Sequence, residues 1–157
     1  MNDLTELLNY TYSLCENEDY ENAIQYFDMI LQKDPENLKI IIDKGVTLIN
    51  LGKLNEALDC IDAALKLDPK NTDALITKGA VLHGLEKYYG AIACYNAALK
   101  INSELPLALT YKGLSLGELD LLQDAIWHFD KALSIDKEME LAILNRKTAF
   151  NLLHNEQ

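Results

Sequence analysis

Several residue types that could do chemistry are present, but their spacing favours binding over catalysis. The histidines and cysteines are far apart and form no CxxC pair: His83, His128, His154, Cys15, Cys60 and Cys94. There is no Gly-rich phosphate loop, and no Ser–His–Asp or Cys–His set is predicted to share one surface. We therefore expect no enzyme activity, no cofactor and no metal site. The odd cysteine count is typical of partly buried thiols in a reducing cytosol, with a disulfide or metal role as the alternative.

Acidic side chains offer a second kind of chemistry, the attraction of basic partners. Asp28 and Asp62 are 34 residues apart, and Asp130 follows Asp62 at twice that interval, with Asn96 midway between them. We interpret these positions as a solvated outer face, with a site for a basic partner as the alternative. The whole chain has a net charge of −11, and Met1 to Pro35 hold eight acids and one Lys. This balance disfavours nucleic acid and anionic membranes, although plain solubility also explains it.

The elements that must position these residues follow from an internal repeat. Two series of small residues recur with a period of about 34 residues, and they are Ala23, Ala57, Ala91 and Ala125, and Gly45, Gly79 and Gly113. Large apolar residues recur at the same interval. Within each repeat their spacing predicts two amphipathic helices. A helical hairpin of this size cannot cover its own apolar face. Neighbouring hairpins are therefore predicted to stack and share a core.

The three recurring glycines fall inside the predicted first helices. Glycine in a helix interior costs about 1 kcal/mol relative to alanine. We expect close packing to offset this cost, with each glycine facing the alanine of its partner helix so that the two backbones approach closely.

The second sequence repeat resembles the tetratricopeptide repeat in Gly45, Ala57, Ile61, Ala64 and Pro69. The resemblance extends from Leu4 to Met139, with departures at Thr11, Ile30, Ser103 and Lys137. It implies a single domain over residues 1–157, an all-α, right-handed α-solenoid of four helix-turn-helix repeats and a C-terminal capping helix. The expected repeats are about 4–37, 38–71, 72–105 and 106–139, and the expected capping helix is about 140–154.

Two helix ends carry further expectations. Ser103 is predicted to cap the first helix of the fourth sequence repeat, with Pro106 in the first turn of that helix. In the last helix, Lys147 stands where the earlier units have glycine, and Arg146 and Asn151 are expected to add to the polar face of a cap.

The resemblance also implies that the first helices line a concave groove that binds a partner. The predicted groove residues are Leu8, Tyr12, Ile42, Asp43, Val46, Ile49, Asp73, Ile76, Ala80, His83, Leu107, Tyr111 and Leu114. So many apolar residues exceed what a merely solvated face needs, although strong curvature or the N-terminal turn could instead cover them. We expect Tyr12, Ile42, Val46, Ile76, Tyr111 and Leu114 to act as apolar anchors. Asp43, Asp73 and Glu16 are expected to favour Lys or Arg in the partner.

Chaperone-binding members of the family hold a C-terminal carboxylate with Lys, Asn and Arg side chains. The matching positions here are Leu8, Tyr12, Asp43, Asp73 and Thr77. None is basic, and two are acids that repel a carboxylate. We therefore reject a carboxylate clamp for the terminal peptides of heat-shock proteins.

The expected function is that of a noncatalytic adaptor or scaffold that binds a peptide or helix of a protein partner with apolar and some basic residues. A self-associating module that pairs through its first helices or Trp127 is one alternative, and a regulatory subunit of a larger, possibly enzymatic complex is another. No apolar run approaches the roughly 18 residues that span a bilayer. The N-terminal residues are acidic where a secretory signal would be basic and then apolar, so we expect a cytoplasmic protein that binds no membrane.

Overall fold

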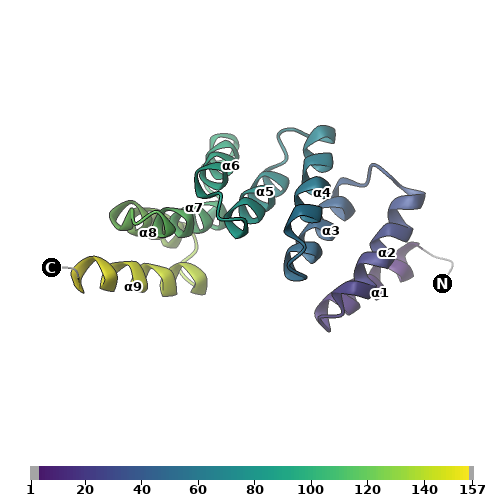
Figure 1. The fold of residues 1–157 in the computed structure, drawn as a ribbon, viewed down its shortest axis with the longest axis horizontal. Helices are drawn as coiled ribbons and strands as arrows, with labels where there is room; N and C mark the ends of the chain where they lie inside the picture. The colour runs from purple at the N-terminus through teal and green to yellow at the C-terminus, as the bar shows by residue number, and fades with distance from the viewer. Residues whose placement is uncertain (1–3, 156–157) are drawn as a thin grey trace. The chain divides into compact units, whose positions relative to one another are not determined.

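The protein is all-α. The computed structural model describes residues 4–155, and within this range it has nine helices and no β-strand (Figure 1). The helices are α1 (Leu4–Glu16), α2 (Tyr20–Lys33), α3 (Leu38–Asn50), α4 (Leu54–Leu67), α5 (Thr72–Gly84), α6 (Tyr88–Ile101), α7 (Pro106–Glu118), α8 (Leu122–Ile135) and α9 (Glu140–Asn155). They belong to two compact units, Met1–Thr77 and Lys78–Gln157, with the boundary inside α5. That the chain forms a single domain stays a prediction from the sequence.

The two helices of each hairpin are joined by one kind of turn. A residue shortly after each first helix has a positive φ: 59° at Glu18, 73° at Gly52, 60° at Glu86 and 62° at Asp120. The next amide donates back into the helix, as from Lys53 N to Leu48 O at 2.9 Å. This is a Schellman cap, which glycine adopts without the steric cost that the acidic residues bear.

Neighbouring hairpins share a core within each unit, as the repeat predicted. In the first unit, Ile40 of α3 packs with buried residues of α1 and α2, among them Leu7 and Phe27. In the second unit, Ala142 and Ala149 of α9 join a core cluster formed mainly by α7 and α8. Each first helix therefore completes the core of the preceding hairpin, which is the packing that defines a stacked helical repeat.

The recurring glycines lie where two helices of a hairpin cross, but their main neighbour differs from the expected alanine. A Cβ at Gly45 would lie 2.4 Å from Ile61 Cδ1 and 3.9 Å from the Ala57 carbonyl oxygen. A Cβ at Gly113 would likewise lie 2.6 Å from Phe129 Cε1. The missing side chain therefore makes room for the large residue one turn beyond the alanine.

Two acids of the second helices, Asp28 and Asp130, pair with bases on the following first helices. Lys44 Nζ of α3 lies 2.5 Å from Asp28 Oδ1 of α2, and Arg146 of α9 pairs with Asp130 of α8. The two pairs have the same separation in the sequence. These pairs were not predicted, although Lys44 and Arg146 occupy the same repeat position three repeats apart. Because these side chains are partly exposed, each pair stabilises the stacking by at most about 1 kcal/mol.

The predicted cap at Ser103 is wrong. The structure begins α7 at Pro106, with Leu105 as the N-cap residue and no side-chain hydrogen bond to the helix. Asn102 Oδ1 instead accepts a hydrogen bond from the Glu104 amide at 2.9 Å. Proline at the first helical position already has a helical φ and lacks an N–H, so this helix start needs less capping.

A small polar group is buried in the second unit. His83 Nδ1 lies 2.8 Å from Ser115 Oγ, and Ser115 is fully buried. The buried Tyr95 hydroxyl has no hydrogen-bond partner in the described part of the chain, although Ser115 is close enough to influence its pKa. Burial raises the pKa of Tyr95 far above its ordinary value. The Tyr95 hydroxyl therefore reduces the stability gained by burying its own ring.

Two glycines of α7 provide a matched test of the helix crossing. Gly113→Ala is expected to lower the urea midpoint of unfolding, because overpacking against Phe129 costs about 1–3 kcal/mol and outweighs the gain in helix propensity. Nothing lies within 4 Å of a Cβ at Gly117. Gly117→Ala is therefore expected to raise the midpoint, by up to about 1 kcal/mol in free energy. A stabilising Gly113→Ala would contradict the proposed role of the crossing.

The imidazoles of His83, partly buried, and His128, buried, predict how stability depends on pH. Burial lowers the pKa of His83, although Glu118 opposes this shift, and burial also lowers the pKa of His128. Below about pH 6.5 the unfolded chain therefore binds protons that the folded chain does not, and stability falls as the pH falls. We expect His83→Gln with His128→Gln to lose less stability than the parent protein between about pH 7.5 and pH 5.5. Urea unfolding at both pH values tests this, and an equal loss in both proteins would count against it.

Candidate functional site

A hydrogen-bonded group of three side chains lies on the first helices of the first unit. Tyr12 Oη of α1 donates to Asp43 Oδ2 of α3 at 2.5 Å. Lys39 Nζ donates to the same carboxylate oxygen at 2.7 Å and lies 4.7 Å from the Tyr12 ring centroid. Burial and the Asp43 hydrogen bond raise the pKa of Tyr12, and the Asp43 hydrogen bond raises the pKa of Lys39. At neutral pH the group is therefore a phenol held between a carboxylate and an ammonium.

An open hollow of about 220 Å³ adjoins this group. Its lining combines aromatic and aliphatic side chains with one carboxylate: Tyr12, Cys15, Tyr20, Phe27, Asp43, Val46, Thr47 and Asn50. Such a surface can take an apolar side chain, and Asp43 adds a site for a positive charge at its edge.

A second hollow in this unit, of about 470 Å³, lies beside the first turn of α3. It is lined by Leu38, Lys39, Ile42, Asp43, Asn71 and Asp73. Asp43 is common to both hollows, and the exposed Asp73 adds a second carboxylate to this one. Lys39, which pairs with Asp43, is the single basic residue in the lining of these two hollows.

The predicted anchors of the first unit differ in how accessible they are. Val46 is 41% exposed, whereas Ile42 and Ile76 are 9% and 6% exposed. Ile42 packs in a core cluster with residues such as Ile61. Val46 is therefore the best placed of these aliphatic side chains for a partner contact, and contacts through Ile42 and Ile76 stay predictions. Leu8 and Ile49 are partly buried.

The predicted groove residues of the second unit are Ala80, His83, Leu107, Tyr111 and Leu114. Leu107 is 41% exposed, and the other four are partly buried. The Tyr111 ring stacks on that of Tyr95, with centroids 6.1 Å apart. Leu114 lines a hollow, whereas His83 is engaged by the buried Ser115.

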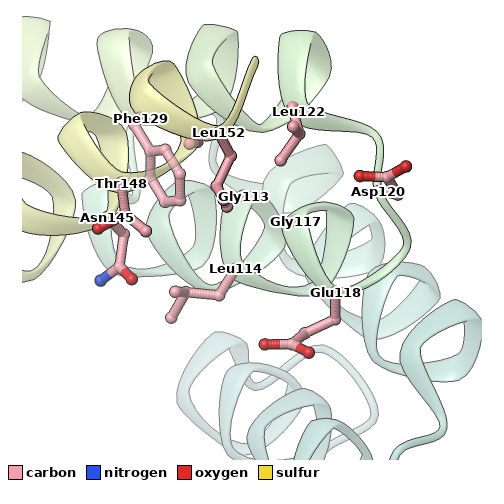
Figure 2. A pocket seen from close by; sticks show the side chains of 11 residues that line it. Gly113, Leu114, Gly117, Glu118, Asp120, Leu122, Phe129, Asn145, Thr148 and Leu152 are labelled. Atoms are coloured by element: carbon pink, nitrogen blue, oxygen red, sulfur yellow. The ribbon is translucent and has the colours of Figure 1, made fainter. Parts of the chain in front are cut away.

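That hollow, of about 350 Å³, is formed by α7, α8, α9 and the turn between α7 and α8. Figure 2 shows Asn145, Thr148 and Leu152 of α9 beside Gly113 and Gly117 of α7. The sequence argument missed these three α9 residues because it treated the last helix only as a cap. They fall one repeat length after Tyr111, Leu114 and Glu118. Extending the groove positions by one more repeat would have found them.

The charge of this hollow is negative. Glu118 and Asp120 line it, together with the apolar Leu114, Leu122, Phe129, Ala149 and Leu152, and no Lys or Arg does. Asp120 is fixed in place by the positive-φ turn that ends α7. The hollow therefore offers an apolar floor and a carboxylate edge, as the smaller hollow of the first unit does.

Within residues 4–155, no group of three or more His, Cys, Asp or Glu side chains could hold a metal ion. Among the helices described, none is both long and apolar enough to cross a membrane. The three cysteines are partly buried, and none of them is in a disulfide.

Comparisons with known proteins agree with the repeat. Models of the tetratricopeptide repeat match residues 11–81 and 72–105. No curated protein sequence matches the chain.

Solved structures with the same fold include three repeat proteins. MamA 41-end from Desulfovibrio magneticus RS-1 is 23% identical with a TM-score of 0.74, and the match covers 96% of this chain and 91% of that one. A tetratricopeptide repeat protein from Parabacteroides merdae is 26% identical with a TM-score of 0.72, covering 97% and 66%. The first such domain of Spaghetti (RPAP3), bound to the HSP90 peptide SRMEEVD, is 21% identical with a TM-score of 0.70, covering 74% and 93%.

The fold class is thus an all-α solenoid of helical repeats, as the period of the sequence predicted. Repeats of this kind are in general noncatalytic protein-interaction modules. From the two matching models and the shared fold, the chain belongs to the tetratricopeptide-repeat family.

Proposed function

We propose that the chain is a noncatalytic adaptor that binds a peptide or helix of another protein on the surfaces formed by its first helices. The observation that carries this proposal is that predicted groove residues line open hollows. Tyr12, Asp43 and Val46 line the hollow of about 220 Å³ in the first unit. Leu114 lines the hollow of about 350 Å³ in the second.

The chemistry of the hollows indicates the kind of partner. Asp43, Asp73, Glu118 and Asp120 are the carboxylates that line them, and Lys39 is already paired with Asp43. A partner segment with apolar residues next to Lys or Arg fits this arrangement, because its charges replace the exposed pairing of Lys39 at little cost. Nucleic acids and anionic membranes do not fit it.

The same charges argue against an acidic peptide. The domain of RPAP3 is bound to the peptide SRMEEVD. Three of its seven residues are acidic, and the last residue is one of them. The positions matching a carboxylate clamp hold Asp43 and Asp73 in this chain, together with Leu8, Tyr12 and Thr77. We expect this chain not to bind SRMEEVD.

Selection from a displayed library of random peptides tests the proposal. We expect enriched peptides to combine apolar and basic residues and to bind about tenfold more weakly to Val46→Glu and to Asp43→Lys, a loss of about 1.4 kcal/mol. Fluorescence anisotropy with a selected peptide measures this loss. SRMEEVD serves as the acidic comparison peptide.

Matched controls separate loss of the site from loss of fold. Met29→Glu places the same charge on an exposed apolar residue of α2, and Asp59→Lys makes the same reversal on an exposed residue of α4. Both are expected to bind like the parent protein. Selection of acidic peptides, or equal losses in the control variants, would overturn the proposal.

A further inference from the structure

The last helix presents an unusual concentration of exposed apolar side chains. Of the sixteen large hydrophobic residues exposed within residues 4–155, five lie on α9: Leu141, Ile143, Leu144, Phe150 and Leu152. Their exposed fractions range from 38% to 63%. By comparison, α8 contributes Trp127 and its terminal residue Ile135 to this set. The polar face expected of a cap is therefore interrupted by an apolar one.

The repeat identifies which face of α9 is open. Three neighbouring residues on α7 are buried: Leu109, Thr110 and Gly113. Their counterparts one repeat later are exposed: Ile143 at 47%, Leu144 at 63%, and Lys147. These three positions are thus covered in α7 and open in α9.

The side chain at the crossing position of this face is larger than in any of the four hairpins, which have Thr11, Gly45, Gly79 and Gly113 there. At Gly45, Gly79 and Gly113 a Cβ would lie 2.3–2.6 Å from a large side chain of the partner helix. Lys147 occupies the equivalent position and has a full side chain there. An occupant must therefore leave room for Lys147 and supply a negative charge to it.

The residues of this face form a self-complementary stripe. Glu140, Ile143, Leu144 and Lys147 are spaced i, i+3, i+4 and i+7, so they lie along one side of α9. All four are exposed, and neither Glu140 nor Lys147 forms an ion pair in the part of the chain described. These two charged residues are about 10.5 Å apart along the helix axis, too far to pair with each other.

We propose that α9 is a dimerisation helix that packs antiparallel on α9 of a second copy of this chain. A two-fold axis between Ile143 and Leu144 places each of them against the other residue of the partner copy. The same axis places Glu140 of each copy opposite Lys147 of the other. A parallel arrangement would instead bring like charges together. The contact is isologous, so it closes at two copies.

The size of the contact sets its strength. One helix packed on one helix buries less than the roughly 1,200 Å² of a stable complex. Both copies also have a net charge of −11, which adds long-range repulsion that salt of about 0.15 M screens. We expect a reversible dimer with a Kd on the order of tens of micromolar.

Sedimentation equilibrium over a dilution series, from low to several hundred micromolar, tests the dimer. Glu140→Lys and Lys147→Glu are each expected to weaken it about tenfold, because each places like charges opposite one another. Combining both substitutions in one chain restores complementarity and is expected to restore the dimer. Mixing the two single variants is expected to give a heterodimer at concentrations where each alone is monomeric.

Two controls complete the experiment. Leu144→Ser removes the central apolar contact and is expected to abolish the dimer, whereas Leu141→Ser alters an exposed residue outside the stripe and is expected to leave it intact. Circular dichroism of each variant checks that α9 remains folded. A chain that is monomeric throughout, or a dimer that is indifferent to charge reversal, overturns the proposal. Because no groove residue is changed, this result is independent of peptide binding.

Discussion

The contact on which the rest of the structure depends is the crossing of a glycine with a large side chain inside three of the four hairpins. Ile61 and Phe129 occupy the space that a Cβ at Gly45 and Gly113 would take. Burying such a side chain completely stabilises the fold by about 1.5–3 kcal/mol, more than the roughly 1 kcal/mol that a helical glycine costs. The crossing fixes the two helices closely enough for the next first helix to complete the core. The separation between the two helices of a hairpin thus helps to place the groove residues of its first helix.

The sequence predicts the fold well because the repeat presents the same evidence several times. Helix bounds, hairpins and the shared core follow from apolar spacing alone, since only stacking covers the apolar faces. The neighbour of each glycine was harder to predict, because periodicity gives the helix face and not the depth to which a side chain reaches. The cap of α7 failed for a local reason. Ser103 is a good cap residue, but Pro106 has already fixed the backbone conformation that starts the helix.

The candidate site is less predictable than the fold. A position in the repeat tells which way Ile42 and Val46 point, but their exposure depends on the size of their neighbours, and they differ from 9% to 41%. The link between Lys39, Asp43 and Tyr12 depends on rotamers that no pattern specifies. Charge, in contrast, is evident from the sequence: Asp43 and Asp73 line the hollows, and the preference for a basic partner stays a prediction.

The residue type at the crossing position differs between α9 and the earlier first helices, and the exposure of the neighbouring apolar residues differs with it. In α3 and α7 the absence of a side chain admits a partner helix, and the apolar residues on either side become core. Lys147 occupies the same place in α9, and the apolar residues beside it are exposed. The position at which the helices of a hairpin cross therefore differs most in size between α9 and the preceding first helices. An apolar face left open in this way is available for recognition, because its hydrophobic residues no longer contribute to the fold of their own chain.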